Sequence, residues 1–160
     1  MSPGAALTLF APLSLMAIAC GPDTAGSAPA SEGKHVFMSN PVVHFEIPVT
    51  DLDRAIAFYE GVFGYQLSRQ NVDGYDMAFF PRADGAAGAS GALAKGDVYR
   101  PSHDGPVIYF DVPDIDAVLE RATARGSKML YPKKDIGAGG FVAEIEDSEG
   151  NRIALSQVKP

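Results

Sequence analysis

The chain has 160 residues, of which 46% are hydrophobic and 21% charged, a composition typical of one globular domain that excludes a disordered or fibrous chain. Its formal net charge is −7 and it has no stripe of lysine and arginine with interleaved aromatic residues, so we expect no nucleic-acid partner. Cys20 is the single cysteine, which excludes an internal disulfide and a cysteine-based zinc site.

The N-terminal residues predict an export signal. Residues 7–19 form an apolar run without charge, about as long as the core of a signal peptide and too short to span a bilayer. Small residues flank Cys20 in a pattern that resembles the bacterial lipobox, in which the cysteine is lipidated. We therefore predict a signal peptide over residues 1–20 and a lipid anchor that holds the protein in the bacterial cell envelope. The alternative is translation from Met38, which would give a cytoplasmic protein.

A flexible tether and one folded domain are expected after the cysteine. Residues 21–39 are rich in glycine, proline, serine and alanine, and they contain little that could pack into a core. The domain is expected over residues 40–160.

An internal repeat predicts the architecture of this domain. The segment VVHFEIPVTDLDRAIAFYEGVFG aligns without a gap on GPVIYFDVPDIDAVLERATARG, which places His44 on Val107, 63 residues later. In the later strands the offset becomes 62 residues, which places Phe79 on Phe141. Offsets that hold over strands and a helix indicate a duplicated unit.

Each unit is predicted to begin with a strand and a helix. Phe45, Ile47 and Val49 alternate in the first strand and should face the core, and the following helix is expected to start at Thr50, whose hydroxyl would cap it, and to end at Gly64.

The second unit repeats this order. Ile108, Phe110 and Val112 are the core-facing residues of its strand, and its helix is expected between Asp114 and Gly126. Shorter strands are predicted at residues 66–71, 75–81, 90–96, 128–132, 141–146 and 151–158. The expected fold is α+β, with two βαβββ modules whose sheets form a shared cleft, the default binding site.

These motifs, together with SGALAKG and DSEGNRIALSQ, resemble the vicinal-oxygen-chelate (VOC) superfamily of glyoxalase I, bleomycin-resistance proteins and extradiol dioxygenases over residues 40–159. The resemblance implies a divalent metal held by one residue from the first and last strand of each module. Those positions are His44, Ala92, Val107 and Ala154. Only His44 offers a lone pair to a metal, so we expect no metal cofactor. The alternative is a rearranged metal site that uses Glu46 and Asp111.

The cleft residues lead to two functional hypotheses. In the first, the domain binds a small organic molecule and acts as a metal-independent lyase or isomerase, related to lactoylglutathione lyase, with His44 and Glu46 as a proton-transfer pair. In the second, it sequesters a drug or metabolite without turnover, as bleomycin-resistance proteins do. Glu46 could instead pair with a lysine or arginine across the cleft. The resemblance also implies a homodimer, and the residues expected to contact the ligand are Phe79, Ala92, Val107, Tyr109, Asp111 and Ala154.

Overall fold

The computed structural model describes residues 40–159, and the predicted signal peptide, the lipidated Cys20, the tether and Met38 lie outside the described residues. No helix in the described part of the chain is long and apolar enough to cross a membrane. The first half contains five elements. They are β1 (His44–Val49), α1 (Leu52–Phe63), β2 (Ser68–Val72), β3 (Tyr75–Phe79) and β4 (Ser90–Lys95).

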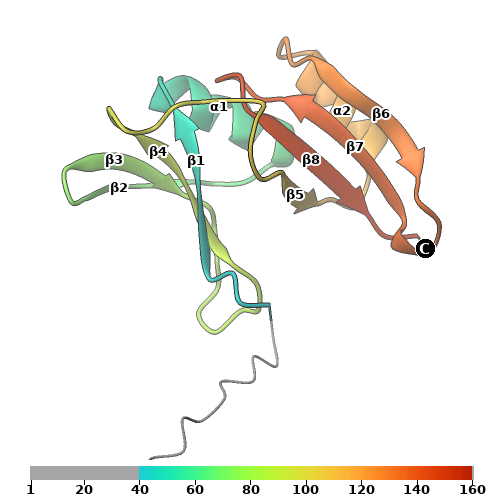
Figure 1. Ribbon diagram of the computed structural model, residues 1–160, viewed down its shortest axis with the longest axis horizontal. Helices are drawn as coiled ribbons and strands as arrows, with labels where there is room; N and C mark the ends of the chain where they lie inside the picture. Colours follow the sequence, from blue (N-terminus) through green and yellow to red (C-terminus); the bar gives the residue numbers. More distant parts are fainter. Residues whose placement is uncertain (1–39, 160) are drawn as a thin grey trace, which may run out of the picture. The chain divides into compact units, whose positions relative to one another are not determined.

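The second half repeats the element order of the first. Its elements are β5 (Ile108–Asp111), α2 (Ile115–Thr123), β6 (Met129–Asp135), the short 3₁₀ helix η1 (Gly137–Gly139), β7 (Phe141–Glu146) and β8 (Arg152–Gln157). The two sheets have the strand orders β1-β4-β3-β2 and β5-β8-β7-β6, and the first strand of each runs parallel to the last (Figure 1). The two predicted βαβββ modules are therefore confirmed.

The strand register confirms one part of the sequence repeat and corrects another. Glu46 lies opposite Ala92 in the first sheet, and Tyr109 lies opposite Ala154 at the equivalent place in the second. Phe79 also lies opposite Ala92, but the residue opposite Ala154 in β7 is Glu144. The predicted match of Phe79 with Phe141 was therefore wrong by three residues, because β6 and the turn after it are longer than their counterparts in the first half.

The helix starts differ from the prediction by one residue in the first half. Asp51, not Thr50, is the N-cap of α1, and its carboxylate accepts a hydrogen bond from the backbone N–H of Arg54 at 3.1 Å. The Thr50 hydroxyl instead donates to Glu149 at 2.7 Å, so the expected cap is used in a contact between the two halves. Asp114 caps α2 as predicted.

One hydrophobic core joins the two modules. The predicted inward residues Ile47, Val49, Phe110 and Val112 are buried, and the ring of Phe110 lies 5.9 Å from that of Tyr59 in α1. Residues of both sheets and both helices belong to the same buried cluster. The halves therefore fold as parts of one domain.

The turn between β7 and β8, residues 147–151, ties the second half to the first. Asp147 is buried and accepts a hydrogen bond from the hydroxyl of Tyr59 at 2.9 Å. The amide of Asn151 donates to the same carboxylate at 2.9 Å and to the backbone oxygen of Pro48 at 2.8 Å. Burial raises the pKa of Asp147, although its hydrogen bonds act in the opposite direction.

Glu149 in the same turn binds the start of α1. Its side chain is completely buried and accepts hydrogen bonds from the backbone N–H groups of Thr50 and Asp51 and from the guanidinium of Arg54. Burial acts to raise the pKa of Glu149, but the hydrogen bonds from Arg54 and Thr50 outweigh it and leave the pKa below its usual value. Glu149 thus stabilises the positive end of α1 from the other module.

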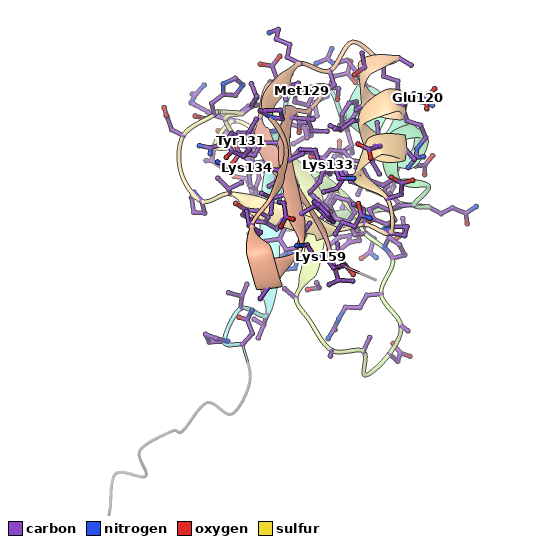
Figure 2. All side chains as sticks on the ribbon, turned by 90° about the vertical axis from the view of Figure 1, so that its right-hand side faces the viewer. Glu120, Met129, Tyr131, Lys133, Lys134 and Lys159 are labelled. Carbon is purple, nitrogen blue, oxygen red and sulfur yellow. The ribbon has the colours of Figure 1, made fainter. Side chains whose placement is uncertain are left out.

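The outer edge of the second sheet is β6. Figure 2 shows Met129, Tyr131, Lys133 and Lys134 along this strand. Pro132 lies at a break in the register between β6 and β7, where proline removes one N–H from the edge.

Candidate functional site

The open face of the first sheet carries a cluster of aromatic and polar side chains. Side chains alternate along β1, so with Ile47 and Val49 buried against α1, His44 and Glu46 point to the opposite face. Met77, Ala92 and Ala94 form the buried floor of that face. The residues of this open-face site are His44, Glu46, Tyr75, Met77, Phe79, Ala92, Ala94 and Tyr99.

Glu46 is the single carboxylate of the open-face site. It accepts a hydrogen bond of 2.7 Å from the hydroxyl of Tyr99, which raises the pKa of Tyr99 to about 12 and keeps the phenol protonated as a donor. Within residues 40–159 no lysine or arginine forms an ion pair with Glu46. The alternative in which Glu46 pairs with a lysine or arginine across the cleft is therefore not seen in these residues. The carboxylate therefore remains available to a positively charged ligand.

His44 is held beside Glu46 by a serine from β4. Its Nδ1 lies 2.7 Å from the Ser90 oxygen, and the Ser90 hydroxyl donates to the backbone oxygen of Val43 at 3.1 Å. A hydroxyl has one hydrogen, so with that hydrogen on Val43 the Ser90 oxygen accepts from Nδ1. This assigns the Nδ1–H tautomer to the neutral ring and leaves Nε2 unprotonated, 3.7 Å from a Glu46 oxygen. Nε2 can therefore accept a proton, and Glu46 would stabilise the resulting charge.

Tyr99 was missed by sequence reasoning. It follows β4 in a turn closed by the hydrogen bond from its N–H to the carbonyl of Gly96, so no strand periodicity covers it. Its ring meets that of Tyr75 edge to face, with centroids 5.4 Å apart, and a side chain on Gly96 would overlap Tyr75. The absence of a side chain at Gly96 therefore allows the two tyrosine rings to pack there. The sequence alone does not indicate this contact.

Phe79 completes the aromatic wall next to His44. The two ring centroids are 6.1 Å apart, so the structure brings together His44, Glu46 and Phe79 of the predicted site. Ala92 is fully buried beneath them.

The predicted site residues of the second half lie on the second sheet, except Val107, which directly precedes β5. Tyr109 is 54% exposed and Asp111 is also exposed, whereas Ala154 is fully buried and Val107 is half-buried. Among the described residues no hydrogen bond or ion pair joins these side chains to His44 or Glu46. The structure therefore does not bring the predicted residues of the two halves into one contact cluster.

A crevice of about 470 Å³ does lie between the halves, beside β1. Glu46 is the one predicted site residue in its wall, so the open-face site and the crevice adjoin at this carboxylate. Most of the wall is apolar, and its charged members are Glu46, Arg100, Asp104 and Arg152. Arg152 is held by Glu144 through two hydrogen bonds of 2.8 Å.

The side chains present do not fit a divalent metal at the four positions implied by the VOC resemblance. His44 is one donor, but Ala92 and Ala154 are buried methyl groups and Val107 has no lone pair. In the part of the chain that the structure describes, no three histidine, cysteine, aspartate or glutamate side chains group closely enough to hold a metal ion. The rearranged set of His44, Glu46 and Asp111 is not assembled either.

Comparison of the sequence with known proteins gives a consistent result. Residues 42–155 match the family described as the Glyoxalase/Bleomycin resistance protein/Dioxygenase superfamily. A lactoylglutathione lyase of Haemophilus influenzae is 30% identical over 125 residues, which cover 74% of this chain and 93% of that protein.

Comparison of the structures extends the similarity to an enzyme and to a binding protein. The trypanothione-dependent glyoxalase I of Leishmania major superimposes with a TM-score of 0.59 at 25% identity, over 74% of this chain and 87% of that one. TnmS3, an antibiotic-binding protein from Streptomyces sp. CB03234, superimposes with a TM-score of 0.56 at 24% identity, over 78% of this chain and all of that one. The fold is thus shared with proteins of both kinds.

Proposed function

Because this chain belongs to the glyoxalase/bleomycin resistance protein/dioxygenase superfamily, we propose that it binds a small organic molecule, planar and positively charged, at the open-face site. The observation that carries this proposal is the carboxylate of Glu46, which is hydrogen-bonded to Tyr99 but forms no ion pair with a lysine or arginine of the described chain. The rings of Tyr75, Phe79 and Tyr99 beside it offer faces and edges to a flat cation. The formal net charge of −7 also favours a positively charged ligand.

A matched pair of fluorescent probes tests the charge preference. 9-Aminoacridine is a cation at pH 7.5 and acridine is neutral, while both have the same three rings. Fluorescence titration should show tighter binding of the cation. Glu46→Gln should weaken the cation about tenfold or more, since a hydrogen bond to a charged group is worth about 1.5–3 kcal/mol, and should leave acridine unchanged. Asp73→Asn, which removes a charge from the β2–β3 turn of the same sheet, serves as the control. Equal affinity for the two probes would contradict the proposal.

A second candidate function is proton transfer by His44 and Glu46, in keeping with the lactoylglutathione lyase relative. The observation that favours it is the position of the His44 Nε2, 3.7 Å from the carboxylate of Glu46. In that case the protein should isomerise a compound with an acidic carbon–hydrogen bond, such as the hemithioacetal of glutathione and methylglyoxal, to S-lactoylglutathione, and His44→Ala and Glu46→Gln should each abolish turnover. If the protein binds such a compound but does not turn it over, sequestration without catalysis is the remaining function.

We further propose that Cys20 anchors the protein in the cell envelope. The support is the apolar run over residues 7–19 and the small residues beside the cysteine. Mass spectrometry of the membrane fraction should find an acylated N-terminal Cys20, whereas a soluble protein that begins at Met38 or Ser39 would contradict the anchor.

We also propose that two copies associate, because β1 and β5 each pair on one side only within the described chain. Light scattering during gel filtration should give the mass of a dimer.

A further inference from the structure

A second hollow, of about 310 Å³, lies on the other face of the first sheet. Its wall includes Phe45, which points away from the face that carries His44 and Glu46. Phe80 is its neighbour at 5.9 Å between ring centroids, and Tyr65 meets Phe80 edge to face at 5.8 Å. Phe110 of β5 completes this cluster of aromatic rings, with its ring centroid 5.6 Å from that of Phe80. We call this hollow the aromatic pocket.

Small residues keep the aromatic pocket open. A side chain on Gly91 would overlap the ring of Phe45, so β4 has no side chain at this place. Beyond Arg82, the loop after β3 contributes methyl groups from Ala83, Ala86, Ala87 and Ala89 to the wall, and its glycines Gly85 and Gly88 have positive φ angles of 72° and 95°. The sequence of this loop therefore builds a cover over the four rings without filling the space beneath it.

Arg82 is the only charged residue in the wall of the aromatic pocket. Its Nη2 donates to the backbone oxygen of Ala86 at 2.7 Å, which fixes the guanidinium at the base of the loop. Within residues 40–159 no aspartate or glutamate forms an ion pair with it, although the chain as a whole is acidic. Nη2 also donates to the backbone oxygen of Gly88 at 3.4 Å, so both of its hydrogens are used. Nε and Nη1 form no hydrogen bond within residues 40–159, so each can donate to an oxygen of an anion.

We propose that the aromatic pocket binds a small aromatic carboxylate, with its ring packed against the cluster of Phe45, Tyr65, Phe80 and Phe110 beneath the alanine loop and its carboxylate on Arg82. The volume suits a body of one or two rings, because an apolar cavity of about 150 Å³ already accommodates benzene. A cation is disfavoured, since the one charge in the wall is positive. This site is separate from the open-face site and takes a ligand of the opposite charge.

Three two-ring probes test the proposal on the full chain. They are 1-naphthoate, the neutral 1-naphthamide and the cationic 1-naphthylmethylamine, each titrated by calorimetry at low salt. The acid should bind about tenfold more tightly than the amide, because a charge-assisted bond to an exposed arginine keeps only part of its strength. The amine should bind most weakly. Arg82→Gln should remove the preference for the acid and leave the amide unchanged.

Two further variants separate pocket binding from surface attraction. Ala86→Leu should weaken both the acid and the amide by filling the hollow, while Arg100→Gln, which removes a charge from the other crevice, should change neither. Glu46→Gln should leave naphthoate binding unchanged, and Arg82→Gln should leave 9-aminoacridine binding unchanged. The proposal for each site can therefore be contradicted without affecting the other. An acid that binds no better than the amide, an unchanged preference in Arg82→Gln, or no binding of any probe would overturn the proposal.

Discussion

At the residue scale, two carboxylates have different roles because their surroundings differ. Glu46 is partly exposed and bonded to one phenol, so it can still bind a ligand. Glu149 is buried and saturated by donors from the first half, so it can only be structural.

Replacing Glu149 with glutamine should lower the free energy of unfolding by about 1–2 kcal/mol, because the partly exposed donors of Thr50, Asp51 and Arg54 lose a charged acceptor. The folded-state pKa of Glu149 is depressed, so its stabilisation is complete above the unfolded-state pKa and is lost as the pH falls through the lower folded-state pKa. Urea unfolding between pH 7 and pH 3 should therefore show a weaker loss of stability at acid pH in Glu149→Gln. Asp53→Asn, at an exposed ion pair, should behave like the unaltered protein.

The sequence could place His44, Glu46 and Phe79 together on one face of the candidate site because they stand on strands whose alternation and repeat are visible. It could not predict Tyr99 or Ser90 as their partners. These contacts join positions 53 and 46 residues apart, and neither partner belongs to a pattern that would signal the contact. Arg82 was likewise invisible, since its importance depends on the absence of an acidic partner in space.

At the element scale, alternation and helix spacing predicted every strand and both helices, but not their partners beyond the module. Thr50 and the next residue, Asp51, both have a side-chain oxygen that can accept a hydrogen bond from the first turn of a helix. Glu149 from the other module binds Thr50 and leaves Asp51 to cap the helix. Register in β7 was mispredicted because the alignment did not allow for the extra residues of β6 and of the turn after it, which change the residue opposite Ala154 from Phe141 to Glu144.

The edge strand β6 leads to a prediction about association. Within residues 40–159 its outer side lacks a partner strand, and Lys133 and Lys134 lie along it (Figure 2). Together with Pro132 they discourage pairing with another chain. Pro132→Val should leave the melting temperature nearly unchanged and should speed aggregation during heating, measured by light scattering. Pro81→Val, in the loop after β3, should not speed it. Slower aggregation in Pro132→Val would contradict this role of the proline.

At the scale of the whole molecule, the two modules depend on each other. They share one core, and the turn of residues 147–151 reaches across to β1 and α1 through Tyr59, Pro48 and Arg54. The duplication seen in the sequence thus produced two similar halves that are joined by contacts specific to each half.

A cut between the halves tests this dependence. A protease site inserted between Asp97 and Val98, in the exposed connection after β4, should give two fragments that remain together during gel filtration in native buffer. They should separate in urea, at a lower concentration when Tyr59→Phe removes the bond to Asp147. Fragments that separate in native buffer would show that each module is stable alone.

The long separation of Glu149 from α1 also bears on synthesis. The ribosome makes α1 first, yet the carboxylate that satisfies its first turn follows 98 residues after Asp51. The nascent first half therefore cannot reach its final stability until the turn between β7 and β8 has been translated. For a protein that we expect to be exported, such late completion would keep the chain loosely folded during its passage to the translocation machinery.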